Sequence, residues 1–492
     1  IFRILQIPWL PGIRSVAEFV YRVVARHRPF FHGVTKLFFG ADIQPAEFKR
    51  IEDLFSKALS AIYFVAFVSI GSQVLGLIGK GGILPAATYL DRVHQALGAA
   101  GYREVPTLFW FGAGDKMLQA GWIAGCLASM LAFDARLRRP AFLAAWALYL
   151  SYVSVGQDFF SFQWDQLLLE AGFLAIFLGW SKWIIWLFRW LLFRLMFLSG
   201  AVKLMSGDPT WRNFTALEYH YQTQPLPTPL AWYAHQWPRW FQHLSVAGVL
   251  GIELFIPFLI FMPRRVRRMA LVPLAGLQIL ILLTGNYAFF NWLALALCLF
   301  LLDDRDLRYP SLPAPVRPMG RRLAYAAAAL VFTLSTYQFL RQFALVPAVP
   351  NPAEPFGIAN NYGLFAVMTT TRPEIVIEGS NDGSHWESYE FRYKPGDPKR
   401  RPAWVAPYQP RLDWQMWFAA LGSPADNPWF VNLLARLLQG SPDVLSLFER
   451  NPFPGAPPRY VRALLYDYKF DHWWRRELLG LYVRPISLAD LR

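Results

Sequence analysis

Charged side chains lie inside stretches of the sequence that are otherwise apolar, and these residues are the best placed to do chemistry. Asp165 and Glu170 fall in the block 162–180, and Lys203 falls in the block 184–205. A charge at the centre of a membrane-spanning helix costs at least about 2.5 kcal/mol, so it needs a partner or a function. Because a lysine in apolar surroundings can lose its proton and act as a base, Lys203 is a candidate catalytic base. Asp165 or Glu170 would then orient it.

The same residues have a structural interpretation. The acidic groups can pair with Arg189, Arg194 or Lys203 of the following block and lock two helices together. The functional interpretation is a polar cavity that opens outward between three successive blocks and includes Glu253 of the block 245–262. Both interpretations stay open on the sequence alone.

A second group of candidates lies in and near the segment 206–244, which is too polar to span a membrane. Its side chains donate or accept hydrogen bonds or stack, which favours either a binding surface or an aromatic belt at the membrane interface. Two asparagines, Asn286 and Asn291, lie near the middle of the later apolar block 270–302 and can also form hydrogen bonds. The candidate binding or structural cluster comprises Asp208, Trp211, Arg212, Glu218, Tyr219, His220, Glu253, Asn286 and Asn291.

The sequence predicts neither a metal nor a cofactor. His220, His235 and His243 are spaced too irregularly for metal ligands. Cys126 and Cys298 both lie in apolar blocks, which excludes a disulfide framework. A catalytic triad and a phosphate-binding loop are also not evident.

Composition indicates an integral membrane protein. Of the 492 residues, 55% are hydrophobic and 16% are charged, against about 25% charged in soluble domains. The apolar residues gather in blocks of about 17–25, the length that crosses a bilayer. The net charge of +15 comes largely from short loops between these blocks, which is the positive-inside pattern. Nucleic acid is therefore not an expected partner.

We predict a polytopic all-α bundle of about nine membrane-spanning helices. The block 270–302 has 33 residues, and as one helix it would run roughly 50 Å against about 30 Å of hydrocarbon. A turn at Gly285 and Asn286 divides it into two spans and puts its flanking basic clusters on one face of the membrane. The predicted spans are 54–78, 116–133, 141–155, 162–180, 184–205, 245–262, two within 270–302, and 323–345.

Charge placement predicts the topology. With the arginine-rich loops in the cytoplasm, the N-terminus is cytoplasmic, and the loops 80–115 and 206–244 face outside. Nine crossings then put the C-terminal domain outside too. The predicted division is an N-terminal cytoplasmic segment at 1–50, a transmembrane domain at 51–346 and an extracytoplasmic domain at 347–492.

The C-terminal domain is predicted to be α+β or β-sandwich-like. Segments 374–378 and 388–393 are typical of strands, and Asn381-Asp382-Gly383 between them is a strong turn signal. We also predict a helix at 431–438 and a late strand at 459–468.

Several long motifs resemble the lipase maturation factor family. They include Ser161-Phe-Gln-Trp-Asp-Gln-Leu-Leu-Leu-Glu-Ala-Gly-Phe-Leu174, Gly207-Asp-Pro-Thr-Trp-Arg212, Leu217-Glu-Tyr-His-Tyr-Gln-Thr-Gln-Pro225, Thr284-Gly-Asn-Tyr-Ala-Phe-Phe-Asn-Trp292 and Arg411-Leu-Asp-Trp-Gln-Met-Trp417. The resemblance covers residues 55–492. It implies a membrane protein that supports folding and assembly of secreted lipases, located in animals in the endoplasmic reticulum. The sequence departs from animal members in lacking outward-facing cysteines. We therefore expect a bacterial inner membrane with a periplasmic C-terminal domain, the endoplasmic reticulum membrane being the alternative.

Two further resemblances bear on function. Residues 4–40 are similar to the end of a DCC-type thiol-disulfide oxidoreductase domain, which implies a thioredoxin-like domain upstream. The stretch Ser199-Gly-Ala-Val-Lys-Leu204, with Asp208 and Trp211, is distantly similar to the membrane domain of vitamin K-dependent carboxylases. That resemblance carries the role of a base to Lys203, although Asp165-Gln166 departs from the carboxylase pattern.

Two functions of different classes remain. The first is a membrane chaperone or assembly factor whose partners are a secreted lipase or other exported client protein and membrane lipid. The second is an intramembrane enzyme that uses Lys203 as a base on a lipidic or quinone-like substrate. The sequence favours the first, without an enzymatic activity.

Overall fold

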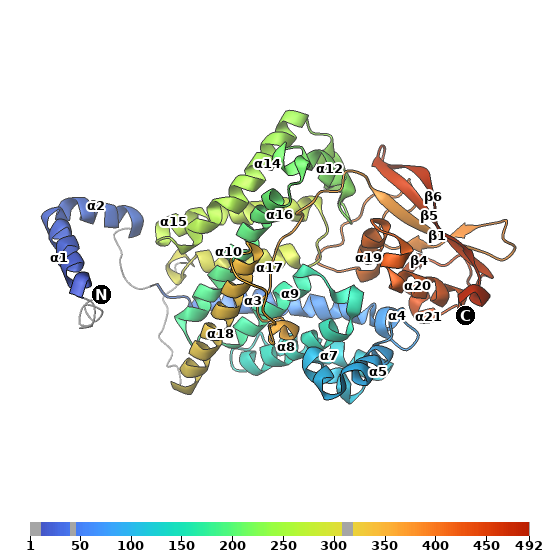
Figure 1. The fold of residues 1–492 in the computed structure, drawn as a ribbon, viewed down its shortest axis with the longest axis horizontal. Helices are drawn as coiled ribbons and strands as arrows, with labels where there is room; N and C mark the ends of the chain where they lie inside the picture. The colour runs from blue at the N-terminus through green and yellow to red at the C-terminus, as the bar shows by residue number, and fades with distance from the viewer. Residues whose placement is uncertain (1–10, 40–45, 308–317, 492) are drawn as a thin grey trace.

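The structure, a computed structural model, describes residues 11–39, 46–307 and 318–491. A bundle of helices lies beside a C-terminal region that contains the strands, and two short helices, α1 (Pro11–Arg26) and α2 (Arg28–Phe39), lie at the opposite end of the bundle (Figure 1). Part of the segment that resembles an oxidoreductase, and residues 308–317 of the last basic cluster, fall outside the described residues.

Every apolar block of the sequence contains a helix. The block 270–302 holds two helices that pack against each other, α16 (Leu271–Thr284) and α17 (Phe290–Cys298), so its division near Gly285 is confirmed. The other bundle helices are α3 (Lys49–Gly71), α7 (Asp115–Leu131), α8 (Arg138–Val155), α9 (Gln163–Ile176), α10 (Lys182–Met205), α14 (Arg239–Leu254) and α18 (Pro318–Gln342).

Five helical stretches in the described chain are long and apolar enough to cross a membrane. They are Lys49–Gly71, Lys182–Met205, Arg239–Phe261, Arg264–Thr284 and Met319–Gln342. The count of nine spans therefore stays a prediction. Helix α9 illustrates the difference, because its 14 residues run about 21 Å, less than the roughly 30 Å of bilayer hydrocarbon.

The loops of the bundle gather in two sets at its two ends. At one end, the basic loops meet the start of α3 and the acidic residues after α17. These contacts are Arg138 with Asp53 (2.8 Å), Arg50 N with Asp304 Oδ1 (3.0 Å) and Arg264 with Asp303 (3.0 Å). At the other end, the loops contact the C-terminal region. These contacts are Arg436 Nε with Gly82 O (2.8 Å), Trp211 Nε1 with Phe365 O (2.9 Å) and Asn286 Nδ2 with Ala403 O (2.9 Å).

The C-terminal region is α+β. Its main sheet is antiparallel, with the strand order β2-β1-β5-β6, and the helices α19 and α20 pack against β1 and β5. The sequence did not predict β6 or α19, and the predicted strand 388–393 is divided between two short strands. The bounds are β1 Pro373–Ser380, β2 Glu387–Ser388, β3 Glu390–Phe391, β4 Phe448–Arg450, β5 Tyr460–Phe470, β6 Trp474–Ile486, α19 Arg411–Ala420 and α20 Pro428–Leu438.

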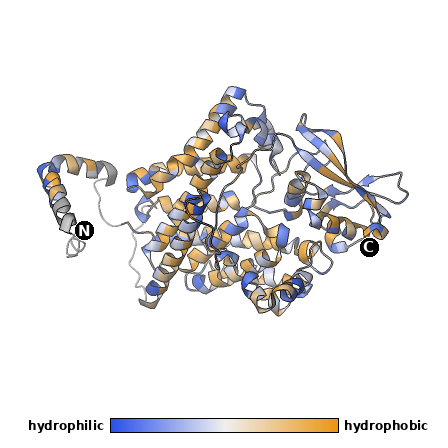
Figure 2. Cartoon of the chain, viewed as in Figure 1, coloured by the Kyte–Doolittle hydropathy of each residue, from blue (hydrophilic) through white to orange (hydrophobic). Residues whose placement is uncertain are grey.

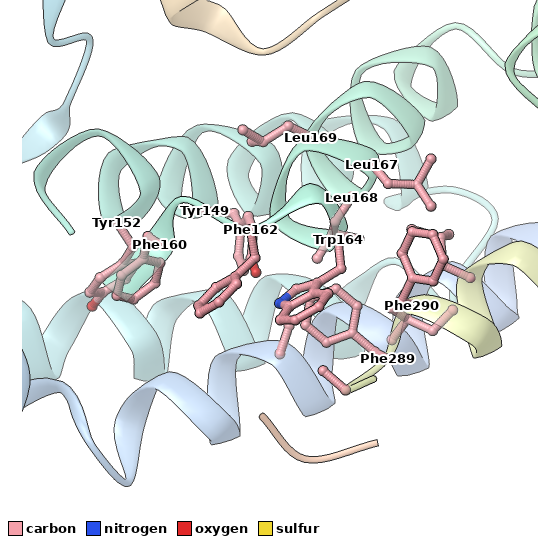
Figure 3. Packing of buried hydrophobic residues seen from close by; sticks show 14 of the residues in the cluster. Tyr149, Tyr152, Phe160, Phe162, Trp164, Leu167, Leu168, Leu169, Phe289 and Phe290 are labelled. Carbon is pink, nitrogen blue, oxygen red and sulfur yellow. The ribbon is translucent and has the colours of Figure 1, made fainter. Parts of the chain in front are cut away.

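One hydrophobic core runs through both the bundle and the C-terminal region. The rings of Phe162 and Trp164, at the start of α9, stack with centres 4.6 Å apart, and Trp414 of α19 meets Trp164 edge-on at 4.6 Å. Figure 3 shows this aromatic layer beside Tyr149 and Phe289. Apolar residues dominate the bundle helices, whereas the strands of the sheet carry both apolar and polar residues (Figure 2). The two parts are therefore packed together rather than joined by a linker.

The crossing of α3 and α9 gives a prediction. A Cβ atom on Gly172 would overlap the hydroxyl of Tyr63, which is buried and donates to Leu168 O at 3.1 Å. Gly172→Ala should therefore destabilise the protein by about 1–3 kcal/mol through overpacking. Thermal unfolding in detergent measures this. Gly248→Ala is the control, because Gly248 of α14 has no neighbour within 4 Å of an added Cβ. An unchanged midpoint for Gly172→Ala would refute the close packing.

Candidate functional site

Asp165 is paired with an arginine of the C-terminal region. Arg411 donates from both terminal nitrogens to the Asp165 carboxylate, at 2.8 and 3.0 Å, and also to Phe159 O at 2.7 Å. Tyr149 of α8 donates to the same carboxylate at 2.5 Å. The Asp165 and Arg411 side chains are fully buried, so the charge of each is neutralised only by this network. The pair joins α9 to α19.

Glu170, five residues further along α9, holds a second network. Its partner is Arg194 of α10, which also donates to Asn360 O at 2.8 Å. The other carboxylate oxygen accepts from Tyr362 Oη at 2.8 Å and from Asn360 N at 3.0 Å. The predicted pairing between the fourth and fifth apolar blocks is thus present here. It also anchors the segment that follows α18.

Lys203, near the end of α10, is paired with Glu253 of α14. Its ammonium donates to both carboxylate oxygens, at 2.7 and 2.9 Å, and to Ser199 O at 3.2 Å. It also lies 5.1 Å from the centre of the Trp211 ring. A base role would require the amine to be released from Glu253, so the geometry favours a structural ion pair.

A cavity of about 90 Å³ lies beside this pair. Asn291 donates to Gln278 at 2.8 Å across its wall, and its own Oδ1 is buried without a hydrogen-bond partner. Burial and the charge of Lys203 lower the pKa of His220 to about 4, so this imidazole is neutral near pH 7. Four residues of the predicted cluster line the cavity together with Lys203, namely Trp211, His220, Glu253 and Asn291.

The structure does not bring the three candidate catalytic residues together. Each belongs to a separate network, and no hydrogen bond or ion pair of the described residues joins Lys203 to Asp165 or Glu170. The prediction that one of these carboxylates orients Lys203 is therefore corrected, because Glu253 does so. The sequence missed Arg411 as the partner of Asp165. Its place in the motif 411–417 was the available signal.

The remaining predicted residues hold the 206–244 segment in place. Asp208 caps α11 (Pro209–Arg212) through Thr210 N at 2.7 Å and accepts from Met368 N at 2.5 Å. Glu218 accepts from His243 at 2.7 Å. Tyr219 packs at the edge of a small apolar cluster, and Arg212 is exposed.

Asn286, at the turn between α16 and α17, joins the bundle to the C-terminal region. Its amide nitrogen donates to Leu226 O at 3.2 Å and to Ala403 O at 2.9 Å. Its amide oxygen accepts from Val405 N at 2.7 Å and from Ala406 N at 3.0 Å. This one side chain therefore fixes two loops from distant parts of the sequence.

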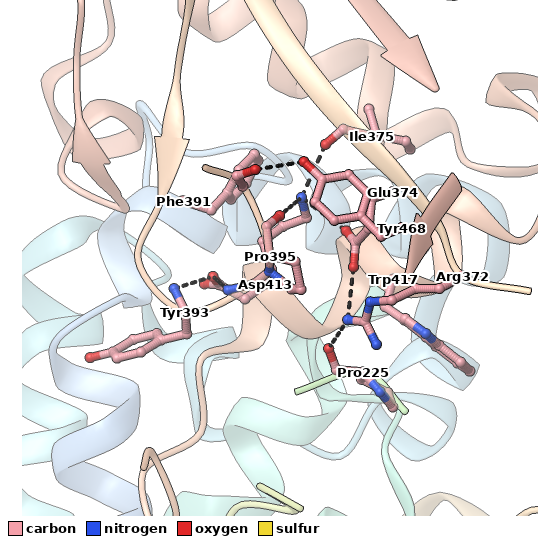
Figure 4. Close-up of polar contacts among 12 residues, drawn as sticks. Pro225, Arg372, Glu374, Ile375, Phe391, Tyr393, Pro395, Asp413, Trp417 and Tyr468 are labelled. Carbon is pink, nitrogen blue, oxygen red and sulfur yellow. Dashed lines mark hydrogen bonds and ion pairs between the residues drawn. The ribbon is translucent and has the colours of Figure 1, made fainter. Parts of the chain in front are cut away.

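A fourth buried charge network was not predicted. Glu374 of β1 pairs with Arg372 at 2.8 Å and with Lys394 at 3.0 Å. Arg372 also donates to Gln224 O and to Pro225 O, the latter at 2.7 Å. Figure 4 shows how this arginine reaches from the sheet to the loop after α12 (Ala216–Thr223).

Within the described ranges, no group of three or more His, Cys, Asp or Glu side chains is arranged to hold a metal ion. Cys126 and Cys298 are buried and unpaired with each other. The chemistry that this site does offer is mutual neutralisation of buried charges, which links helices and loops in a fixed geometry.

Comparison with known proteins gives a consistent result. A model described as the lipase maturation factor transmembrane domain matches residues 50–309, and one described as the lipase maturation factor C-terminal domain matches 358–484. Lipase maturation factor 2 of Gallus gallus is 37% identical over 90% of this chain and 82% of that protein. Lipase maturation factor 2 of Mus musculus is also 37% identical, over 89% and 83%. Lipase maturation factor 1 of Bos taurus is 35% identical over 89% of each.

No solved structure matches the chain. The relatives named above are animal proteins, so they give the predicted bacterial inner membrane no support. These relatives also give no support to the resemblance to carboxylases.

The Asp165–Arg411 pair gives a prediction. Arg411→Met leaves a buried carboxylate unpaired and should destabilise the protein by about 3–5 kcal/mol. The double variant Asp165→Leu/Arg411→Met removes both charges and should recover most of this loss. Thermal unfolding in detergent, with limited proteolysis of the C-terminal region, measures both effects.

Arg239→Gln is the control for this prediction. Arg239 is 87% exposed and lies 3.9 Å from Glu218, so its loss should cost at most about 1 kcal/mol. If Arg411→Met were as stable as this control, the buried pair would not hold the two parts together.

Proposed function

The chain belongs to the lipase maturation factor family, and we propose that it assists the folding or assembly of secreted lipases or other exported client proteins. One observation supports a holding role most directly. One buried ion pair, Asp165 with Arg411, and one continuous core dock the C-terminal region onto the bundle, so the two regions that match the family are packed as one unit. Such a unit presents a preformed surface, which reduces the entropy that a client complex must lose.

We propose a topology of nine crossings. The N-terminal segment 1–50 would lie in the cytoplasm, the spans within 51–346, and the C-terminal domain 347–492 on the opposite side. The gathering of the basic loops at one end of the bundle supports this, since basic loops stay in the cytoplasm. So does the contact of the loops 80–115 and 206–244 with the C-terminal region. The short helices α7, α8, α9 and α17 would cross as parts of the packed bundle.

The proposed membrane is that of the endoplasmic reticulum, where lipases enter the secretory route. Relatives from animals support this location over a bacterial inner membrane. The domain at 347–492 would then face the lumen, together with the aromatic segment that begins α14. Membrane lipid would surround the exposed apolar faces of α14, α16 and α18.

We assign structural roles to Lys203, Asp165 and Glu170. Each carries a buried charge that is neutralised by a dedicated partner, and each pair connects two different helices or regions. A pair that serves structure can be replaced by apolar residues of similar volume with little loss, whereas a catalytic base cannot.

This assignment leads to a prediction with secreted lipase as the readout. Host cells that lack an endogenous factor should secrete lipase of higher specific activity when they express this chain. Lys203→Met/Glu253→Leu should retain this effect, because it removes both charges of the pair. Arg411→Met should lose most of it, because the C-terminal region is undocked. Activity per mass of secreted lipase is measured, with the amount of inserted protein as normalisation.

Site-specific photocrosslinking completes the test. Crosslinkers at Trp237 and Trp404, which are 45% and 55% exposed on the C-terminal side, should trap the lipase. A crosslinker at Leu137, 44% exposed at the basic end, should not. No gain in lipase activity and no crosslink from either tryptophan would refute the proposed function. Loss of lipase activation by the Lys203→Met/Glu253→Leu variant, with normal folding and crosslinking, would instead support a catalytic role for Lys203.

A further inference from the structure

A polar cleft of about 370 Å³ lies where the last membrane span ends. The candidate span Met319–Gln342 ends in the wall of this cleft, and the segment that contains Glu354 forms its opposite side. The headgroup layer of a bilayer begins where a span ends. The cleft therefore lies at the depth of lipid headgroups. Its polar lining consists of Gln338, Arg341, Gln342, Glu354, Asn360 and Asn361.

The cleft carries one positive and one negative side chain that do not neutralise each other. Arg341 and Glu354 are both exposed, and in the described part of the chain no ion pair links them. In the other cavity, by contrast, Lys203 and Glu253 are paired with each other. The polar cleft therefore offers a cationic group to an anion and an anionic group to a cation, and a ligand that carries both charges would complement both side chains.

Hydrogen bonds hold amide side chains of the cleft lining in place. Asn361 donates to Gln338 at 3.3 Å, and Gln338 is buried. Asn360 donates to Gly357 O at 2.9 Å and to the Glu170 carboxylate at 3.3 Å, so the ion pair of Glu170 supports the cleft from behind. Because these amides are already held in place, a ligand would lose little further side-chain entropy on binding.

We propose that this cleft binds the headgroup of a zwitterionic phospholipid. The phosphate would lie against the guanidinium of Arg341, whose planar fork suits phosphate oxygens. The ammonium of an ethanolamine headgroup would lie against Glu354, and the amide nitrogens of Gln338 and Gln342 would donate to the remaining phosphate oxygens. Glu354 also sets selectivity, because it repels a headgroup that carries only negative charge. The proposal rests on the membrane placement proposed above and not on the lipase role.

Native mass spectrometry of the purified full chain tests this, with phosphatidylethanolamine and phosphatidylglycerol as probes. The wild-type protein should retain more phosphatidylethanolamine than phosphatidylglycerol. Arg341→Gln should weaken retention of both lipids about tenfold, the loss of one charge-assisted contact. Glu354→Gln should abolish the preference and raise retention of phosphatidylglycerol. Both side chains are exposed, so thermal midpoints should stay unchanged.

Arg239→Gln is the matched control, since Arg239 begins another candidate span and is not among the residues that line this cleft. It should leave lipid retention unchanged. Equal retention of both lipids by the wild-type protein and all variants would overturn the proposal. Binding of soluble phosphoethanolamine without any retained lipid would also overturn it, because the ligand of the cleft would then be a free headgroup and not a membrane lipid. Lipase maturation is not measured in this experiment, so the two proposals fail independently.

Discussion

Each buried charge in this molecule must have a partner, and this constraint determines how the helices and the C-terminal region pack together. Asp165 and Glu170 lie one and a half turns apart on α9, and neither can be left unpaired in an apolar interior without a cost of several kcal/mol. Their partners lie at very different distances along the sequence. Arg194 follows shortly on α10, whereas Arg411 arrives from the C-terminal region. Helix α9 therefore becomes the point at which the bundle and the C-terminal region are joined.

Other polar contacts also connect the bundle to the C-terminal region. Asn286 fixes the turn between α16 and α17 against the segment around Ala403, and Arg372 fixes the loop after α12 against the sheet. Each contact uses main-chain carbonyls of a loop that has no regular partner of its own. Buried main-chain groups must be paired, so these side chains determine the loop conformations. These loops, at the end of the bundle that contacts the C-terminal region, are consequently held at several separate places.

The sequence predicted what depends on local pattern. Apolar blocks located the bundle helices, and Gly285 located the break between α16 and α17. The pairing of Glu170 with a cation of the next block was foreseeable because adjacent antiparallel helices face each other. Arg411 was not, because its partner is 246 positions away and only the three-dimensional fold brings them together.

The elements that the sequence missed have physical reasons of their own. Strand β6 begins with Trp474-Arg475-Arg476-Glu477, and its pairing with β5 is irregular near Leu479, so no clean alternation marks it. Helix α19 is buried on nearly every side. An amphipathic pattern requires one exposed face, and α19 has none over most of its length.

The pairing of buried charges also applies to Lys203, which the resemblance to carboxylases and its apolar surroundings had suggested as a base. A catalytic base needs a nitrogen that a substrate can reach. Here both carboxylate oxygens of Glu253 bind the Lys203 nitrogen, at 2.7 and 2.9 Å, and the Trp211 ring centre lies 5.1 Å from it. The pair also connects the end of α10 to α14, just before the 206–244 segment leaves the bundle. Its position therefore matches that of the other buried pairs, each of which fixes a segment on the side of the C-terminal region.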